Sequence, residues 1–438
     1  MNAWIKAVQG MALGTPMLLM LLGTHFYFTI RLRFIQKKIP QGIYMSFSKN
    51  GQGEGNISPF SALATSLAAT IGTGNIIGIS TAIAIGGPGA VFWCWVTGIF
   101  GIATCYAECY LSVKFRVCQA DGTYAGGPMY IMEGVLKQKS AAIVFAVAAV
   151  LVSFGMGSSV QAHSIVSAVT EQVRLSSGYV GVCLAFFAGI VILGGAEQIT
   201  KVCTCLVPFM SVFFLGGCFF LIWENREVFP ETIQAIVKSA FSSKPVIGGI
   251  TGTAVMEGLR VGISRGLFTS EAGLGSIPIS AAAARTQSPY RQGLVSMTGV
   301  FWDTVVMCAV TGIAIVGCML KEPELYQQAE ANRLCFLAFS NLPVLGSEML
   351  SVSLVLFAFA TIIGWSYYGE CAVRYLGKGR GRIVYKVLYI CFILFGAVMP
   401  LNMVWGIADL FNLLMMIPNL ICLWMLRKWI VGKEEKSP

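Results

Sequence analysis

The stretch that decides the fold runs Ala69-Thr-Ile-Gly-Thr-Gly-Asn-Ile-Ile-Gly78, inside an apolar segment that covers residues 58–86. Three glycines, two threonines and an asparagine make a poor α-helix, although the segment is long enough to cross a bilayer. Non-helical backbone at membrane depth is tolerated only where it is buried in protein or lines a cavity. The sequence therefore predicts a transmembrane helix that is broken at Gly72–Asn75.

A second apolar segment, residues 247–279, is interrupted in a similar way. It contains Gly262-Ile-Ser-Arg-Gly-Leu-Phe-Thr-Ser-Glu-Ala-Gly-Leu-Gly275 and is also longer than the roughly 20 residues that a continuous membrane helix needs. Small residues in membrane helices usually serve close packing, and that alternative would explain an isolated pair of glycines. Two matched interruptions, one of them carrying an asparagine, favour paired discontinuous helices at a transport site.

The composition of the chain indicates a membrane protein. Of its 438 residues 56% are hydrophobic and only 11% are charged, with a mean hydropathy of +0.74, whereas soluble domains carry about 25% charged residues. The net charge of +10 lies in short clusters between apolar runs, which is typical of membrane topology signals rather than of nucleic-acid binding. The 14 cysteines are scattered without metal or redox spacing.

The apolar segments predict an all-α integral membrane protein with about eleven transmembrane helices. The expected spans are 10–31, 58–86, 89–112, 141–168, 178–195, 201–222, 247–279, 293–320, 347–369, 384–400 and 403–426. The two interrupted spans are the second and the seventh, which fits one extra N-terminal helix followed by a 5+5 inverted repeat.

This reading divides the chain into four parts and orients it. We expect an N-terminal helix and cytoplasmic loop in residues 1–57, five-helix repeats in 58–222 and 247–426, and a cytoplasmic tail in 427–438. Basic residues gather after the first span and in the tail, so the positive-inside rule puts the N-terminus outside and the C-terminus in the cytoplasm. The expected location is the cytoplasmic membrane.

The broken helices suggest what is carried. A break exposes free N–H groups at the start of the second half-helix and free C=O groups at the end of the first. The N–H end suits a carboxylate, and the C=O end suits a dehydrated cation such as sodium. A zwitterionic amino acid with a co-transported cation matches both ends.

Other polar residues inside spans are further candidates. Thr361 and Trp365 lie one turn apart and could offer a cation ligand beside a lid on a small substrate, whereas aromatic residues at a membrane interface are the alternative. Gln161 is a candidate substrate contact, and His163 is read as an interior residue. The remaining ionisable residues fall into two groups. Those on the second broken span are read as structural or gating groups, with direct ligation as the alternative: Glu257, Arg260, Arg265 and Glu271. Those in or near other spans are read as packing or helix-end partners rather than proton carriers: Glu108, Asp303 and Asp409.

Several motifs together resemble the alanine or glycine:cation symporter family, whose architecture is similar to the neurotransmitter:sodium symporter (LeuT-type) fold. They are Asn56-Ile-Ser-Pro-Phe60, Ala69-Thr-Ile-Gly-Thr-Gly-Asn-Ile76, Gly86-Gly-Pro-Gly89, Gly126-Gly-Pro-Met129, Gly266-Leu-Phe268, Glu271-Ala-Gly-Leu-Gly-Ser276 and Gly364-Trp-Ser-Tyr-Tyr-Gly-Glu370. They cover most of the chain. The resemblance implies uptake of alanine, glycine or a similar neutral amino acid, driven by sodium or sometimes by protons.

The resemblance also implies site residues. The implied substrate contacts are Thr73, Gly74, Asn75, Gln161, Trp365 and the backbone from Gly262 to Gly266. The implied sodium ligands are Ala68, Ile71 and Thr361. Two departures from the family pattern, Ser270 before Glu-Ala-Gly and His163 after Gln161, bear on the choice of substrate and ion.

The sequence therefore predicts a secondary active symporter rather than an enzyme. We expect a small neutral amino acid, sodium and the lipid bilayer as partners, no nucleic acid, no cofactor, and a functional monomer. Proton coupling and a different neutral amino acid remain alternatives within this class. A channel would predict a continuous polar pore, and a membrane enzyme would need a nucleophile–base or metal constellation, which the sequence does not show.

Overall fold

The computed structural model describes residues 15–48, 53–173, 175–241, 255–327, 329–331, 333–343, 345–399 and 401–433. The start of the predicted span 10–31, the start of the predicted span 247–279 and the end of the predicted tail 427–438 lie outside these residues.

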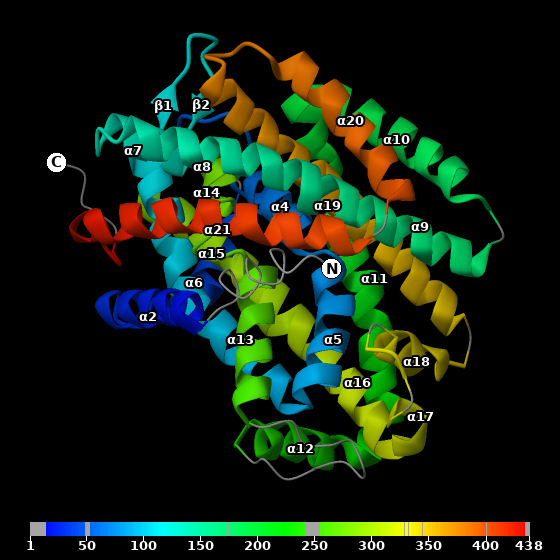
Figure 1. Cartoon of the computed structure of the whole chain (residues 1–438). Helices are drawn as coiled ribbons and strands as arrows, with labels where there is room; N and C mark the ends of the chain where they lie inside the picture. The colour runs from blue at the N-terminus through cyan, green and yellow to red at the C-terminus, as the bar shows by residue number, and fades with distance from the viewer. Residues whose placement is uncertain are drawn as a thin grey trace.

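Helices make up nearly all of the described chain (Figure 1). The long ones are α2 (Thr15–Arg31), α6 (Gly89–Lys114), α10 (Ser177–Leu193), α11 (Gly195–Glu224), α13 (Val255–Ser270), α19 (Gly346–Leu376), α20 (Arg382–Val398) and α21 (Leu401–Met425). Two more units widen into π-helix midway: α8 (Lys139–Val152), η3 (Ser153–Ser159) and α9 (Val160–Gln172); and α15 (Pro289–Val300), η5 (Phe301–Cys308) and α16 (Ala309–Lys321).

Several helices have the length and composition of membrane spans. Among the described residues, five helical units are long and apolar enough to cross a bilayer, or seven if each of two bent pairs counts as one span. One bent pair joins α2 to the following α3 (Ile39–Phe47) through η1 (Ile35–Lys38), with a bend of 66°. The other joins α4 (Pro59–Thr70) to α5 (Ile77–Gly86) through η2 (Thr73–Asn75). The chain is thus a multi-pass membrane protein.

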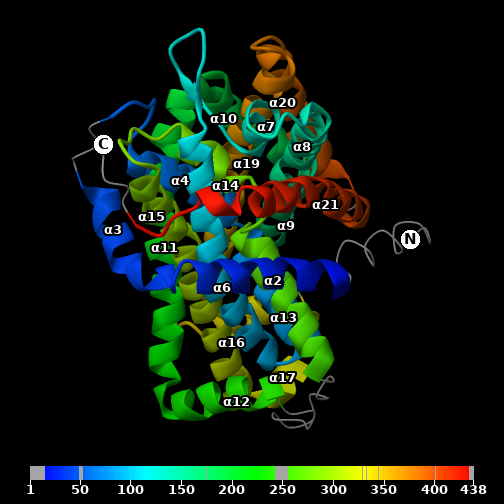
Figure 2. The same ribbon diagram turned by 90° about the vertical axis from the view of Figure 1, so that its left-hand side faces the viewer.

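Helix α6 lies at the centre of the helices that flank the two predicted breaks. It packs against α13, α15, α2 and α14 (Ile277–Ala282), and most of its side chains beyond Thr97 are buried. Helix α19 packs against α4, α8, α9 and α11. Figures 1 and 2 both show α21 crossing this assembly alongside α8, its contact partner. The broken helix α4–α5 is therefore enclosed between α6 and α19.

Helices α10 and α20 run side by side at the periphery (Figure 1). Each exposes large apolar side chains on its outer face, such as Phe186 and Phe187 on α10 and Ile383 and Phe395 on α20. A row of exposed aromatic and aliphatic side chains is unfavourable in water but normal against lipid. These two helices therefore present a lipid-facing surface.

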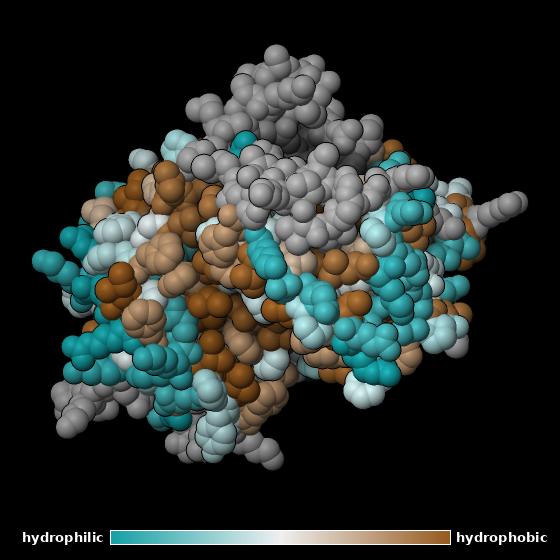
Figure 3. All heavy atoms as spheres, turned by 90° about the horizontal axis from the view of Figure 1, so that it is seen from below, coloured by the Kyte–Doolittle hydropathy of each residue, from teal (hydrophilic) through white to brown (hydrophobic). Residues whose placement is uncertain are grey.

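The elements between the long helices are short. They are the helices α7 (Pro128–Gly134), α12 (Phe229–Phe241), α17 (Pro323–Gln327) and α18 (Leu334–Ser340), and the turns η4 (Arg226–Val228) and η6 (Arg427–Trp429). A hairpin of β1 (Val117–Cys118) and β2 (Tyr124–Ala125), with Val117 opposite Ala125, is the one departure from the expected all-α structure in the described residues. Seen from the α12 end, polar residues flank an apolar central strip (Figure 3).

Candidate functional site

The first predicted break is present where the sequence placed it. Helix α4 begins after Ser58, whose hydroxyl caps it by accepting the N–H of Ser61 at 3.0 Å, and it ends at Thr70. Helix α5 resumes at Ile77 after a 60° change of direction. Asn75 stabilises the turn between the two because its Oδ1 accepts the N–H of Gly72 at 3.0 Å.

The break leaves backbone donors available. Neither the N–H of Thr73 nor that of Gly74 has a hydrogen-bond acceptor within the described part of the chain, whereas Asn75 and Ile76 donate to Gly72 and Thr73 at 3.2 and 3.3 Å. Thr73 and Asn75 are almost fully buried. Free N–H groups at the start of a half-helix attract a carboxylate, so this turn can receive an anionic group.

Gln161 lies over the same turn. The Thr73 hydroxyl donates to Gln161 Oε1 at 3.3 Å, and Gln161 Nε2 donates to the carbonyl oxygen of Met156 at 3.2 Å. Met156 belongs to the π-helical stretch η3, which ends one residue before α9 begins at Val160. Such wide turns within α-helices are frequent at functional sites. The structure thus brings Thr73 and Gln161 together.

Two of the three predicted sodium ligands are also adjacent. The Thr361 hydroxyl lies 3.4 Å from the carbonyl oxygen of Ile71 and donates to Phe357 O at 3.0 Å. Ala68 is fully buried on the turn before, and a Cβ built on Gly364 would approach the Ala68 carbonyl carbon at 3.1 Å. The last turn of α4 therefore lies against the Thr361–Gly364 face of α19.

Trp365 is fully buried one turn beyond Thr361. Its ring meets Tyr368 edge-on, with centroids 5.6 Å apart, and a Cβ on Gly157 would come within 2.4 Å of its Cβ, so the π-helical stretch η3 packs directly on it. The indole lies beside Glu271, but its Nε1 makes no hydrogen bond within the described residues. Trp365 therefore connects the Thr361 face of α19 to the second break.

The second break lies at the C-terminal end of the predicted stretch 262–275. Helix α13 runs without interruption through Gly262 and Gly266 to Ser270. A Cβ on Gly262 would lie 2.4 Å from the Ala90 carbonyl oxygen, and one on Gly266 would lie 2.9 Å from that of Cys94. These two glycines let α13 pack closely against α6. The prediction of open backbone at Gly262–Gly266 is wrong, and the geometry does not favour a substrate contact there.

The true interruption covers residues 271–276, between α13 and α14. Glu271, Gly273 and Gly275 have positive φ angles of 50°, 94° and 85°, which glycine adopts readily and glutamate does not. The Ser276 hydroxyl donates to Glu271 Oε2 at 2.5 Å. Glu271, whose role the sequence left open, thus sits in the break itself with a buried side chain.

A residue that the sequence analysis read as a packing partner contacts the site directly. Asp303, on η5, is fully buried, and its Oδ1 accepts the Asn75 amide at 2.8 Å while its Oδ2 accepts the Thr304 hydroxyl at 2.7 Å. The Asn75 amide also points at Cys308 Sγ, 3.3 Å away. A lone acidic residue in mid-span is the signal that could have identified it.

No group of three His, Cys, Asp or Glu side chains among the described residues could hold a metal ion.

Of the other ionisable candidates, Arg265 reaches the start of α5, directly after the first break. Arg260 is exposed on α13, and the Cδ of Arg265 lies 3.9 Å from a Cβ built on Gly78. The Nδ1 atom of His163 is buried without a hydrogen-bond partner in the described part of the chain. The side chains of Glu257 and Asp409 lie outside the described residues.

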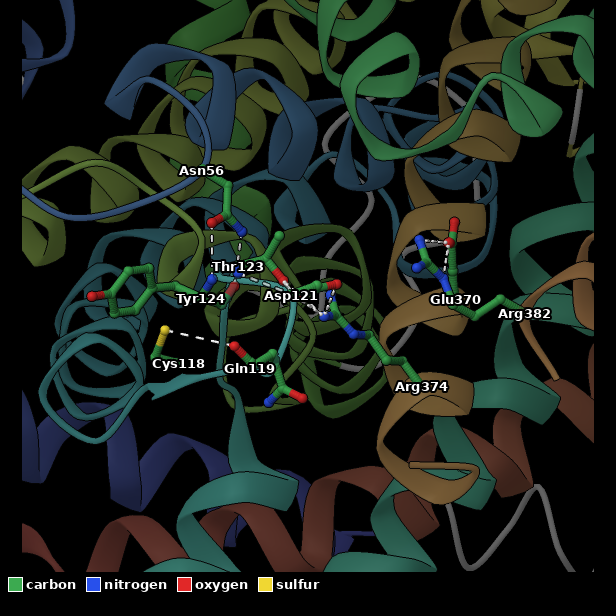
Figure 4. Close-up of polar contacts among 9 residues, drawn as sticks. All are labelled: Asn56, Cys118, Gln119, Asp121, Thr123, Tyr124, Glu370, Arg374 and Arg382. Carbon is green, nitrogen blue, oxygen red and sulfur yellow. Dashed lines mark hydrogen bonds and ion pairs between the residues drawn. The ribbon is translucent and has the colours of Figure 1, made fainter. Parts of the chain in front are cut away.

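A network of polar contacts lies between the β1–β2 hairpin and the C-terminal end of α19 (Figure 4). Asp121, in the β1–β2 turn, receives the Arg374 guanidinium at 2.6 and 2.7 Å, and Asn56 pairs with both backbone groups of Tyr124. Hydrogen bonds from Thr123, together with Arg374, lower the pKa of Asp121 to about 2. A cavity of about 380 Å³ lies among these residues, Cys371 and Arg382.

Comparison with known proteins adds an independent line of evidence. The sequence profile of the sodium:alanine symporter family matches residues 1–436. The chain is 42% identical to a sodium/alanine symporter, AgcS, of Methanococcus maripaludis, over 98% of this chain and 96% of that protein. It is 36% identical to a probable sodium/glutamine symporter, GlnT, of Bacillus subtilis, over 94% and 85%. The structure of MhsT in complex with L-phenylalanine superimposes with a TM-score of 0.59 at 13% identity, covering 86% of this chain and 90% of that one.

Proposed function

The chain belongs to the sodium:alanine symporter family, and we propose from this premise that it takes up alanine or glycine together with sodium by alternating access. The observation that carries the proposal is the first helix break, where free N–H groups and clustered oxygen atoms lie within one buried turn. A symporter needs its ion and its substrate to favour the same conformation, and sites that share one turn provide that coupling directly.

The substrate site comprises the turn from Thr73 to Asn75. The N–H groups of Thr73 and Gly74 bind the carboxylate of the amino acid. Gln161 lies against Thr73 and offers amide groups to the polar end of the substrate. Trp365 bounds the pocket with an apolar face, and the neighbouring Gly157 contact leaves it little freedom to move aside. A small side chain such as that of alanine suits these buried surroundings.

The sodium site comprises the carbonyl oxygens of Ala68 and Ile71 and the hydroxyl of Thr361. Carbonyl groups at the end of a half-helix carry partial negative charge and have no intrahelical donors, so they coordinate a dehydrated cation well. Sodium at this position holds the last turn of α4 against α19. That contact in turn fixes the adjoining Thr73–Asn75 turn, which is how ion occupancy raises substrate affinity.

The number and orientation of the membrane spans also follow from membership of this family. We propose eleven spans, with an N-terminal helix outside a 5+5 inverted repeat formed by residues 58–222 and 247–426, the N-terminus outside the cell and the C-terminus in the cytoplasm. The functional unit is a monomer in the cytoplasmic membrane. The likeness in fold to other transporters and the broken helices at α4–α5 and α13–α14 support this arrangement.

Uptake of radiolabelled alanine into proteoliposomes, with and without an inward sodium gradient at fixed pH, tests the function. Accumulation that requires sodium supports the proposal, and competition by glycine or glutamine then ranks the substrates. Glutamine is included because of the relative named for it. Accumulation driven by a proton gradient alone would replace sodium with protons, and an absence of alanine transport would contradict the substrate assignment.

A further inference from the structure

The two helix breaks differ in what remains available to a ligand. At the first break the N–H groups of Thr73 and Gly74 have no acceptor within the described residues. At the second break the N–H groups of Ala272, Gly273 and Leu274 all have acceptors within the described residues. Ala272 donates to the Ser270 hydroxyl at 3.4 Å, and Leu274 donates to the Glu271 carbonyl oxygen at 3.1 Å.

The Gly273 N–H of the second break donates to a carboxyl group from another helix. Glu108, on α6, accepts it at Oε2, 3.2 Å away. Asn419, on α21, donates its amide both to Glu108 Oε1 and to the Gly273 carbonyl oxygen, the latter at 2.9 Å. Glu108 and Asn419 are almost fully buried.

Both oxygens of Glu108 have a hydrogen-bond donor, the Gly273 N–H at Oε2 and the Asn419 amide at Oε1. Among the ion pairs of the described residues none involves Glu108, so these hydrogen bonds hold its carboxyl group in place. The loop packs closely against its neighbours, because a Cβ on Gly273 would lie 2.5 Å from Leu21 Cδ2 and one on Gly275 would lie 2.8 Å from Pro128 Cγ.

We infer that Glu108 is a positioning residue that, with Asn419, holds the Gly273 turn of the second break through its own carboxyl group. The inference rests on the proposed function in one respect: it leaves the first break as the place where the carboxylate of the substrate binds. The second break then acts as a fixed joint, held between α6 and α21, rather than as a receptor for the substrate's charged group.

Chemical rescue tests this role. Glu108→Ala removes the carboxylate and leaves space beside the Gly273 N–H and the Asn419 amide, so formate should bind there. We expect the purified variant to melt at a lower temperature than the wild type and to be restabilised by formate, at constant total sodium and without alanine. Alanine uptake should fall at least about tenfold, the effect of losing hydrogen bonds to a charged group, and recover severalfold with formate.

Asn419→Ala is the matched control, because it damages the same network but keeps the carboxylate. Its stability should fall without any response to formate. Glu108→Gln provides a second test if Glu108→Ala cannot be purified, because an amide cannot accept hydrogen bonds on both sides. That variant should be destabilised and insensitive to formate.

Two results would overturn the inference. One is a Glu108→Ala protein that is folded but shows no formate-dependent rise in melting temperature. The other is a Glu108→Gln protein that melts like the wild type. Both readouts are independent of transport, so a failure here is distinguishable from a failure of the symport proposal, which the wild-type uptake assay decides.

Discussion

The contact between α4 and α19 at Gly364 provides a sharp test of the proposed sodium site. A Cβ built on Gly364 would lie 2.7 Å from the backbone nitrogen of Ala69, whereas ordinary contacts begin near 3.4 Å. Because the obstacle is backbone, Gly364→Ala must push the last turn of α4 away from α19 by about 0.7 Å. The same displacement separates the Ile71 carbonyl from the Thr361 hydroxyl, which lie on that interface.

The size of the effect follows from the cost of overpacking. Adding a methyl group to a tightly packed contact costs about 1–3 kcal/mol. If the cost falls on the sodium-bound state, the sodium concentration that gives half-maximal alanine uptake rises by about 5- to 150-fold. The assay is initial-rate uptake in proteoliposomes over a range of sodium concentrations at saturating alanine.

Gly216→Ala is the matched control, because Gly216 lies in the long helix α11 and a Cβ there meets no atom within 4 Å. It should leave the sodium dependence unchanged, because the added methyl group contacts no other atom. Alanine is also a better helix former than glycine. A Gly364→Ala protein with the sodium dependence and melting temperature of the wild type would refute the reasoning, because it would show that this contact does not position the ion ligands.

Three further predictions follow from individual contacts. Asn75→Ala removes the bond to Gly72 N and should abolish sodium-coupled uptake while folded protein still reaches the membrane, as fractionation and uptake assays would show. Gly262→Ala should lower the melting temperature by overpacking against α6 but leave alanine affinity in binding assays near that of the wild type. Because Thr123 and Arg374 hold the pKa of Asp121 at about 2, below its ordinary value near 3.9, the stability that its charge contributes should be complete above about pH 4 and disappear toward pH 2. A comparison of melting temperatures between wild type and Asp121→Asn across that range would show a difference that narrows as the pH falls.

The first break could be predicted from sequence because its residues are poor helix formers for local reasons. Gly72, Gly74 and Asn75 stand close together in an otherwise apolar span, and local propensity was enough to place the turn. The contacts that complete it are not local. Gln161 and Thr361 reach this turn from helices that are distant in the sequence. The sequence marked them as polar residues inside spans, and the resemblance to a family suggested their place at this turn.

The second break shows why glycine content alone misplaces a turn. Gly262 and Gly266 have helical neighbours and serve the approach of α13 to α6, whereas Gly273 and Gly275 supply positive φ angles. The two pairs of glycines look alike in the sequence. The role of the first pair depends on a partner helix, and that of the second on backbone conformation, and neither can be read from local sequence. The packing of α13 against α6 decides which glycines lie within the helix and which lie in the break.

The buried acids illustrate the same limit. Glu108 and Asp303 were read from the sequence as packing or helix-end partners. In the structure each carboxylate contacts a break, Asp303 through Asn75 and Glu108 through Gly273. An acidic residue in mid-span marks a functional region, but the identity of its partner depends on how helices far apart in the sequence are arranged.

The measurement that tests the account most directly is binding of radiolabelled alanine to the purified protein over a range of sodium concentrations, with wild type and Thr361→Val compared. The variant keeps the shape of the side chain and removes one proposed sodium ligand. The account predicts that sodium raises alanine affinity in the wild type and that Thr361→Val needs at least about tenfold more sodium for the same effect. Alanine binding with the same sodium dependence in both proteins would contradict a coupling site at the first break.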